Sequence, residues 1–277
     1  MTSKTPDRDA LKDRARILAL YGLEAHFEEL TPDDLILIRR VLEWEEGERQ
    51  RRSLERRVRN ARIGDFKSMA DFDWAWPKRC DREVVDDLLT LQFLGEGANA
   101  IFLGPNGVGK STMAKNVAYQ ALLAGHTVRF VTASQMLNDL AAQDSAASLQ
   151  RRLARYTGPK LLCVDELGYL SYGNRHADLL FEVVSRRYEA GRSTIITTNK
   201  PFAEWTDVFP NAACVVTLVD RLMHKADIVQ VDGESYRLKE ARERSEQKAS
   251  ARSSRRQSKR SNGAQKTKRS SEAEHDA

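Results

Sequence analysis

One octapeptide fits the phosphate-binding pattern G-x-x-x-x-G-K-[ST] at every fixed position: Gly104-Pro105-Asn106-Gly107-Val108-Gly109-Lys110-Ser111. The three glycines allow successive backbone N–H groups to turn inward around a phosphate. Lys110 would reach the β- and γ-phosphates, the Ser111 hydroxyl would take one position on a Mg²⁺ ion, and Thr112 would extend the same helix start. The octapeptide predicts binding of a nucleoside triphosphate.

The residues on either side of the octapeptide have the order that this motif requires. Residues 99–103 are typical of a buried strand leading in, and residues 111–124 of a helix leading out. A chance glycine-rich turn is the alternative, but it does not explain the strand and the helix.

A second apolar run, Leu161–Val164, ends in two carboxylates, Asp165 and Glu166. Asp165 would hold Mg²⁺, mostly through its water shell, and Glu166 would polarise the attacking water as a general base. The alternative is a strand that exits into solvent through acidic residues. A P-loop about sixty residues upstream favours the catalytic interpretation.

Two further polar residues have two interpretations each. Asn199 follows the apolar run 194–198 and either orients the lytic water or forms a turn before Lys200. Arg221 is expected near a helix start within 218–224. It is either a solvated or ion-paired surface group, or an arginine finger donated to a neighbouring subunit's γ-phosphate.

Strand and helix patterns alternate from residue 99 to about 238, which predicts an α/β domain with a parallel sheet covered on both faces. The expected strands are 100–103, 128–132, 161–164, 194–198 and a stretch near 228–231. The sequence therefore predicts a central parallel sheet of five strands.

Two segments of different composition precede this α/β domain. Residues 1–63 predict a small all-helical domain with a helix starting at Pro32, and its last helix carries an arginine-rich run, 49–62. That run is either a solvated helix face or a surface for DNA phosphates or an acidic partner. Residues 64–98 form a connector, whose aromatic cluster 72–76 is expected to anchor it on a domain surface rather than to stack on bases.

Residues 239–277 are expected to form a disordered basic tail. After Leu238 the chain has no Leu, Ile, Val, Met, Cys or aromatic residue, so a packed core cannot form there. This tail holds twelve Lys and Arg against six Asp and Glu, so its net charge is +6. The net charge of the whole chain is +5, so the excess positive charge lies in the tail.

The composition is that of an ordinary globular protein, 41% hydrophobic and 31% charged. No apolar run is long enough to span a bilayer, and the first residues lack the apolar region of a signal peptide, so a cytoplasmic protein is expected. Three widely spaced cysteines without a C-x-x-C pair suit reduced thiols and offer no zinc site.

The chain carries a series of short motifs: Gly104–Ser111, Gly125–Phe130, Val164–Leu170, Ser185–Glu189, Thr197–Lys200, Asp220–His224 and Gly233–Arg237. The series resembles the IstB-like AAA+ ATPases, transposition helpers that insertion sequences encode with a transposase. The resemblance covers roughly residues 10–238, and DnaC-type helicase loaders share most of these motifs.

The resemblance implies an α/β AAA+ fold and an oligomer with ATP and Mg²⁺ at its subunit interfaces. It also implies two partners. One is duplex DNA, bound without strong sequence preference, and the other is a cognate transposase. Lys110 and Ser111 match the Walker A positions, and Asp165 and Glu166 the Walker B pair. Asn199 then matches the first sensor and Arg221 the interface arginine, while Arg237 is a candidate for the second sensor.

Three functions agree with these observations. The first is an ATPase that oligomerises on duplex DNA and recruits and stimulates a transposase. The second is a helicase loader, which would use the same ATPase core and dock its N-terminal domain on a replicative helicase. The third is a DNA-bound scaffold that ATP organises and in which hydrolysis is incidental.

Overall fold

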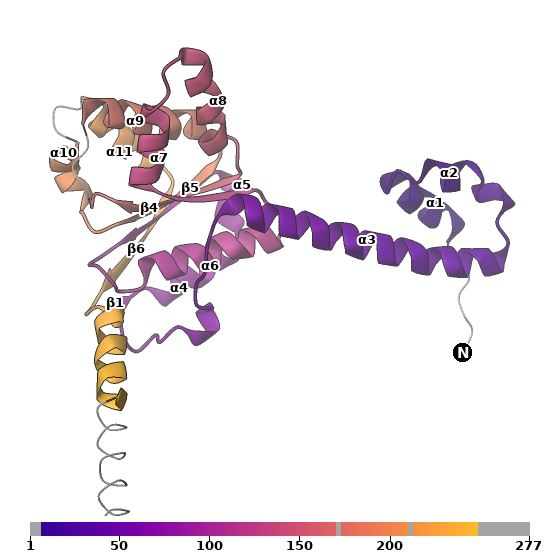
Figure 1. Cartoon of the computed structure of the whole chain (residues 1–277), viewed down its shortest axis with the longest axis horizontal. Helices are drawn as coiled ribbons and strands as arrows, with labels where there is room; N and C mark the ends of the chain where they lie inside the picture. The colour runs from indigo at the N-terminus through magenta and orange to yellow at the C-terminus, as the bar shows by residue number, and fades with distance from the viewer. Residues whose placement is uncertain (1–6, 170–172, 210–212, 249–277) are drawn as a thin grey trace, which may run out of the picture.

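The computed structural model describes residues 7–169, 173–209 and 213–248. A small cluster of helices lies at one end of the long helix α3 (Pro32–Ala61), and an α/β body lies at the other end (Figure 1). Residues 249–277, the greater part of the expected tail, lie outside the described residues.

The N-terminal cluster consists of α1 (Arg8–Ile17), α2 (Tyr21–Ala25), a 3-10 turn (Phe27–Glu29) and the first half of α3. Its core is small and apolar, with Leu11, Phe27 and Leu42 all buried. The helix start at Pro32 is confirmed. The Thr31 side chain accepts from the backbone of Asp34 while the Asp34 carboxylate accepts from that of Thr31, and this reciprocal cap satisfies two free N–H groups.

The sheet has six strands in the order β1-β6-β2-β5-β4-β3. Their bounds are β1 (Arg79–Cys80), β2 (Asn99–Leu103), β3 (Val128–Thr132), β4 (Leu161–Leu167), β5 (Ser193–Thr198) and β6 (Ala226–Asp232). The five expected strands are confirmed and run parallel to one another. The five-strand prediction was nevertheless one strand short. Two connector residues pair antiparallel with the end of β6, and a two-residue strand leaves no periodic signal in a sequence.

Two apolar layers enclose the sheet. One contains the end of α3 with α4 (Arg82–Leu89), α5 (Gln92–Glu96) and α6 (Lys110–Leu123). The other contains α7 (Ala133–Ala141), α8 (Ala146–Thr157), α9 (Asn174–Glu189), α10 (Trp205–Val208) and α11 (Cys214–Met223). Strand β4 shows the alternation, because Leu161 and Cys163 face the first layer while Leu162 and Val164 face the second.

The connector packs on the body in the same layer. It contains a 3-10 turn (Met69–Asp71) besides β1, α4 and α5. A 3-10 turn outside the connector, Phe202–Glu204, precedes α10. Phe66, Phe72 and Trp74 pack against the first apolar layer, so the aromatic cluster does anchor the connector on the domain surface.

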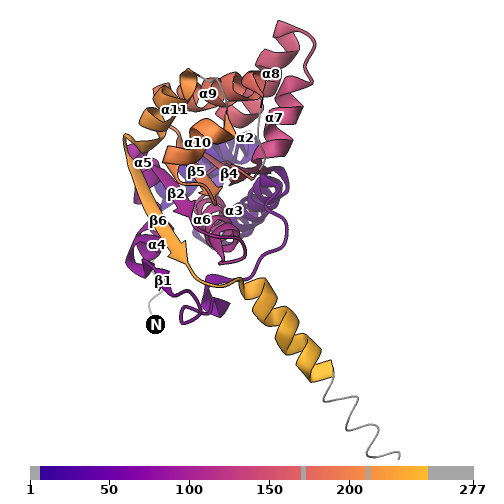
Figure 2. The same ribbon diagram turned by 90° about the vertical axis from the view of Figure 1, so that its left-hand side faces the viewer.

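Residues 236–248 form a helix that leaves the body beside the connector (Figure 2). The first ten residues of the segment expected to be disordered, 239–248, are therefore helical in this structure. Within the described ranges, no helix is both long enough and apolar enough to cross a membrane.

Candidate nucleotide-binding site

The P-loop turns sharply between β2 and α6, and its glycines are needed both for conformation and for close packing. Gly107 and Gly109 have φ angles of +81° and +107°, a region that other residues avoid. A Cβ on Gly107 would lie 2.1 Å from Ser235 Oγ, and one on Gly109 would lie 2.7 Å from Phe72 Cε2. The loop is thus held between the connector and the start of the C-terminal helix.

Lys110 points back over this loop. It is 4% exposed, and its Nζ donates to the carbonyl oxygens of Gly104 at 2.6 Å and Pro105 at 2.7 Å. Burial lowers the pKa of Lys110 to about 8, with the charge of Arg237 acting in the same direction and Asp165 opposing both. A phosphate oxygen would replace these carbonyls as the partner of the ammonium group.

Ser111 and Asp165 meet at the adjacent edge of the sheet. Ser111 Oγ donates to Asp165 Oδ1 at 2.8 Å, and Thr197 Oγ1 donates to the same oxygen. Thr197 Oγ1 also accepts from the backbone N–H of Glu166 at 3.0 Å, so it links the two acids. A hydroxyl beside a carboxylate is the hard oxygen donor set that Mg²⁺ prefers, and these residues fit the ion.

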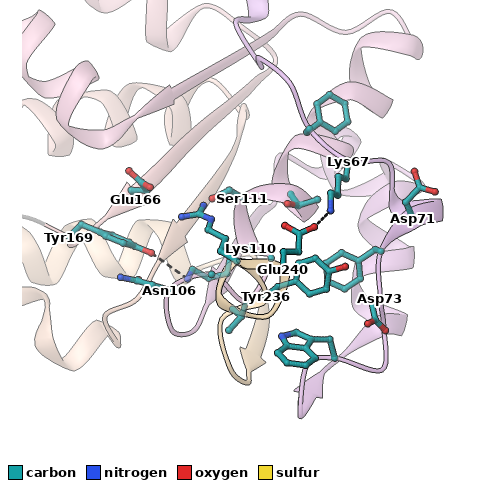
Figure 3. Close-up of a pocket in the computed structure, with 18 residues that line it drawn as sticks. Lys67, Asp71, Asp73, Asn106, Lys110, Ser111, Glu166, Tyr169, Tyr236 and Glu240 are labelled. Atoms are coloured by element: carbon teal, nitrogen blue, oxygen red, sulfur yellow. Dashed lines mark hydrogen bonds and ion pairs between the residues drawn. The ribbon is translucent and has the colours of Figure 1, made fainter. Parts of the chain in front are cut away.

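Glu166 has an unusual backbone conformation for a strand residue. Its φ is +61°, and the pairing of β4 with β5 shifts register between Val164 and Leu167. Such a conformation costs free energy in a residue with a side chain, and it is typical of functional positions. The irregularity leaves Glu166 exposed beside the buried Asp165, where its side chain lines the same cavity as Lys110 (Figure 3).

A cavity of about 330 Å³ opens in front of the P-loop. Residues 106–112 and Glu166 form its phosphate end, whereas Phe66, Phe72 and Trp76 of the connector and Tyr236 form an aromatic wall. The sequence reasoning missed this wall. The density of aromatic residues in 72–76 was the available signal, but it did not indicate which surface the connector covers.

The C-terminal segment closes the cavity from the other side. The backbone N–H of Tyr236 donates to Gly107 O at 2.9 Å, and Trp76 Nε1 donates to Glu234 O at 2.9 Å. Lys239 pairs with Asp73 at 3.0 Å, and Glu240 pairs with Lys67 of the connector. Between these contacts the exposed Arg237, the candidate second sensor, lines the cavity.

The two remaining predicted residues lie apart from the cavity walls. Asn199 follows β5, and its Oδ1 is a buried acceptor without a hydrogen-bond partner among the described residues. Arg221 is not near a helix start as predicted. It lies in the last turn of α11, because that amphipathic helix already begins at Cys214.

The surroundings of Arg221 are aromatic. Its guanidinium lies 5.2 Å from the ring centroid of Phe181 and 5.7 Å from that of Tyr188, and its contact with Glu189 is long, at 3.9 Å. Arg221 is absent from the walls of this chain's own nucleotide cavity.

Comparisons with known proteins identify the family of this chain. The profile of the family described as "IstB-like ATP binding protein" matches residues 11–244. An ATP-binding protein of insertion sequence IS5376 from Geobacillus stearothermophilus is 35% identical over 203 residues, covering 73% of this chain and 80% of the relative. The corresponding protein of IS21 from Pseudomonas aeruginosa is 35% identical over 219 residues, covering 79% and 82%.

Among solved structures, DnaI is similar with a TM-score of 0.50 and 16% sequence identity, covering 64% of this chain and 92% of that one. This likeness concerns the fold. The family profile spans most of the chain, and the P-loop and the acidic pair lie within the residues that it matches. The chain belongs to the family of IstB-like ATP-binding proteins, in which the relatives described above are ATP-binding proteins of insertion sequences.

Proposed function

We propose that this protein hydrolyses ATP and uses the nucleotide to assemble on duplex DNA, where it recruits and stimulates the transposase of its insertion sequence. The observation that carries the ATPase proposal is the arrangement around Asp165. Ser111 and Thr197 both bond to its carboxylate, Lys110 lies over the P-loop, and Glu166 faces the same cavity.

Each of these residues has a task in phosphoryl transfer to water. The P-loop N–H groups and Lys110 bind and orient the phosphates, and Ser111 with Asp165 would hold Mg²⁺, which neutralises charge that develops on the phosphate oxygens. Glu166 accepts a proton from the attacking water. Asn199 would orient that water only after moving toward the bound nucleotide, because its Oδ1 is buried and does not line the cavity. The aromatic wall of Phe72, Trp76 and Tyr236 suits the adenine base.

The assembly proposal rests on Arg221 and on the relatives. Arg221 does not line its own cavity, and its contact with Glu189 is long, so the guanidinium would serve the γ-phosphate bound by a neighbouring copy. The curated relatives are named as ATP-binding proteins of insertion sequences, which supports transposition over helicase loading.

Steady-state ATP hydrolysis with duplex DNA tests the enzymatic part. We expect Glu166→Gln to reduce kcat by about 10²–10⁴-fold while retaining ATP binding, and Lys110→Ala to weaken both. Glu96→Gln, which alters an exposed acid at the end of α5, is the matched control. Full hydrolysis by Glu166→Gln would refute the proposed base. Full transposase stimulation by a hydrolysis-dead Glu166→Gln would instead favour the scaffold function.

Mixing two inactive variants tests the shared site. Arg221→Ala and Lys110→Ala should each be inactive alone. A mixture should regain hydrolysis, because an intact P-loop can then meet an intact Arg221 from another copy. Electron microscopy of the wild-type protein with ATP and duplex DNA would show the assembly directly. A mixture as inactive as its components would exclude a finger supplied between copies.

A further inference from the structure

Three arginines that are distant in sequence meet beside the edge strand β3, and none of them lines the P-loop cavity. Arg62 follows α3, Arg129 lies in β3, and Arg155 lies in the last turn of α8. All three line two adjoining grooves, one running toward Lys115 and Asp165 and the other toward Arg59. We call these three residues the arginine cluster.

Arg129 is the unusual member of the cluster. It is 6% exposed, yet it forms no ion pair with any carboxylate in the described part of the chain. Its Nη1 donates to Asn60 O at 3.1 Å and its guanidinium lies 6.0 Å from the Tyr156 ring centroid, but its buried Nε has no hydrogen-bond partner. Burial lowers the pKa of Arg129, and the like charges of Arg155 and Arg62 lower it further. A buried cation without a counter-ion is costly, and a bound anion would remove that cost.

The arginine-rich end of α3 divides into two parts. Arg49, Arg51 and Arg52 form ion pairs with glutamates of the same helix, so their charge is largely balanced. Arg59 and Arg62 are exposed and have no ion pair to a described residue. Arg56 and Arg57 likewise have no ion pair to a described residue, so the uncompensated charge at this end of α3 extends over residues 56–62, up to the arginine cluster.

We propose that the arginine cluster binds phosphate groups of a duplex DNA backbone. This rests on the proposed DNA binding and assigns a surface to it. Arginine matches phosphate because its planar guanidinium can donate two parallel hydrogen bonds. The groove that contains Arg59 has no acidic residue in its wall, and it is this groove that suits a polyanion with closely spaced charges. The arginine cluster also lines the adjoining groove, where Asp139 and Asp165 offset part of its charge.

An acidic surface of a second protein is the competing occupant. Protein interfaces bury apolar side chains at their centre, whereas DNA interfaces are polar and positively charged. The large apolar residues that line the grooves, Phe130, Val131 and Tyr156, are already 7%, 6% and 2% exposed. They offer little apolar area to a protein partner, so the surface fits a nucleic acid better.

The test is the salt dependence of duplex binding by the full chain with a non-hydrolysable ATP analogue. The double variant Arg62→Ala/Arg155→Ala removes two exposed or half-exposed members and leaves the buried Arg129 in place. Losing two phosphate contacts should reduce the slope of log K against log salt by about 1.8. The affinity ratio of wild type to variant should then fall about tenfold between 50 and 200 mM salt. The control Arg49→Ala/Arg52→Ala makes the same change in net charge but removes paired arginines, and its slope should stay close to that of the wild type.

The outcomes distinguish a failure of the cluster proposal from a failure of the proposed DNA binding. If the wild-type chain binds no duplex, the proposed DNA function fails and this proposal fails with it. If the wild type binds and the slope of the cluster variant is unchanged, only the cluster proposal is overturned. An equal fall in cluster and control variants would overturn it as well, since general charge would then suffice. Retained DNA affinity with lost self-association would show that the cluster instead binds carboxylates of a second copy.

Discussion

The charge of Lys110 should make nucleotide binding depend on pH in a window that few other groups affect. Burial holds the pKa of this lysine at about 8 in the nucleotide-free protein, against 10.5 for an ordinary lysine. Bound phosphates stabilise the ammonium form and raise the pKa again. Above pH 8, binding must therefore take up a proton, and the affinity for ATP must fall as the pH rises.

The size of the effect follows from these two values. Between pH 8 and 10.5 the Kd should rise by up to about tenfold per pH unit, and between pH 7.5 and 9.5 by about twentyfold in total. The groups that face Lys110 are Asp165, Glu166, Arg237 and Tyr169. Of these, Tyr169 has a pKa that burial raises above its usual 10, so its titration lies above the interval from pH 7.5 to 9.5.

The assay is an equilibrium titration with a fluorescent ATP analogue across this range. Lys110→Arg should bind with little pH dependence because a guanidinium does not titrate there, and Lys110→Ala should bind weakly at every pH. The pH dependence of folding stability provides an internal check, because its sign is opposite to that of the ATP affinity. The unfolded chain holds the lysine proton up to pH 10.5, so the contribution of Lys110 to stability increases from pH 8 to 10.5 while ATP affinity decreases. A wild-type Kd that stays constant from pH 7.5 to 9.5 would refute the reasoning.

Three substitutions test further contacts, the first at the amino ends of β4 and β5 and the other two around the nucleotide site. Arg187→Met should lower the free energy of unfolding by about 3 kcal/mol in urea denaturation. The buried guanidinium donates to four backbone carbonyls and to Thr194 Oγ1, and all five acceptors lose a partner in the variant. An unchanged denaturation midpoint would contradict this. Thr197→Val should reduce kcat about 10–100-fold with little change in ATP affinity, since it removes the hydroxyl that links Asp165 to Glu166; unchanged kcat would show that the link is dispensable. Gly107→Ala should weaken ATP binding and expose the helix 236–248 to trypsin, because the new Cβ would collide with Ser235 Oγ and the φ of +81° strains an alanine. Adding Ser235→Gly should restore only part of the ATP affinity, because the φ strain remains. Wild-type behaviour of the single variant would count against the close contact.

The parts of the fold that could be predicted from the sequence are those set by local pattern. The strand, turn and helix around the P-loop follow from a short motif, and the five parallel strands follow from short apolar runs between helices. Arg221 shows where such reasoning fails. The polar residues beside it resembled a helix cap, but the apolar periodicity of α11 carries the helix through them from Cys214.

The remaining parts of the site depend on contacts between distant residues. Tyr236 reaches Gly107 from the far end of the chain, and Phe72 reaches Gly109 from the connector. The arginine cluster likewise joins residues 62, 129 and 155. No periodicity connects such positions, because tertiary packing alone decides which surfaces meet.

The packing around the P-loop also indicates how a nucleotide would affect the rest of the molecule. The connector continues directly from α3, which carries the N-terminal helical cluster (Figure 1). It meets the C-terminal helix at the aromatic wall. The ion pairs Lys67–Glu240 and Lys239–Asp73 join the two segments to each other, while Phe72 and Ser235 hold them against successive P-loop glycines. A ligand that fills the cavity therefore touches both segments that leave the α/β body. Its binding energy must favour the arrangement of connector and C-terminal helix that fits it, because a ligand shifts an equilibrium only through such differential contacts.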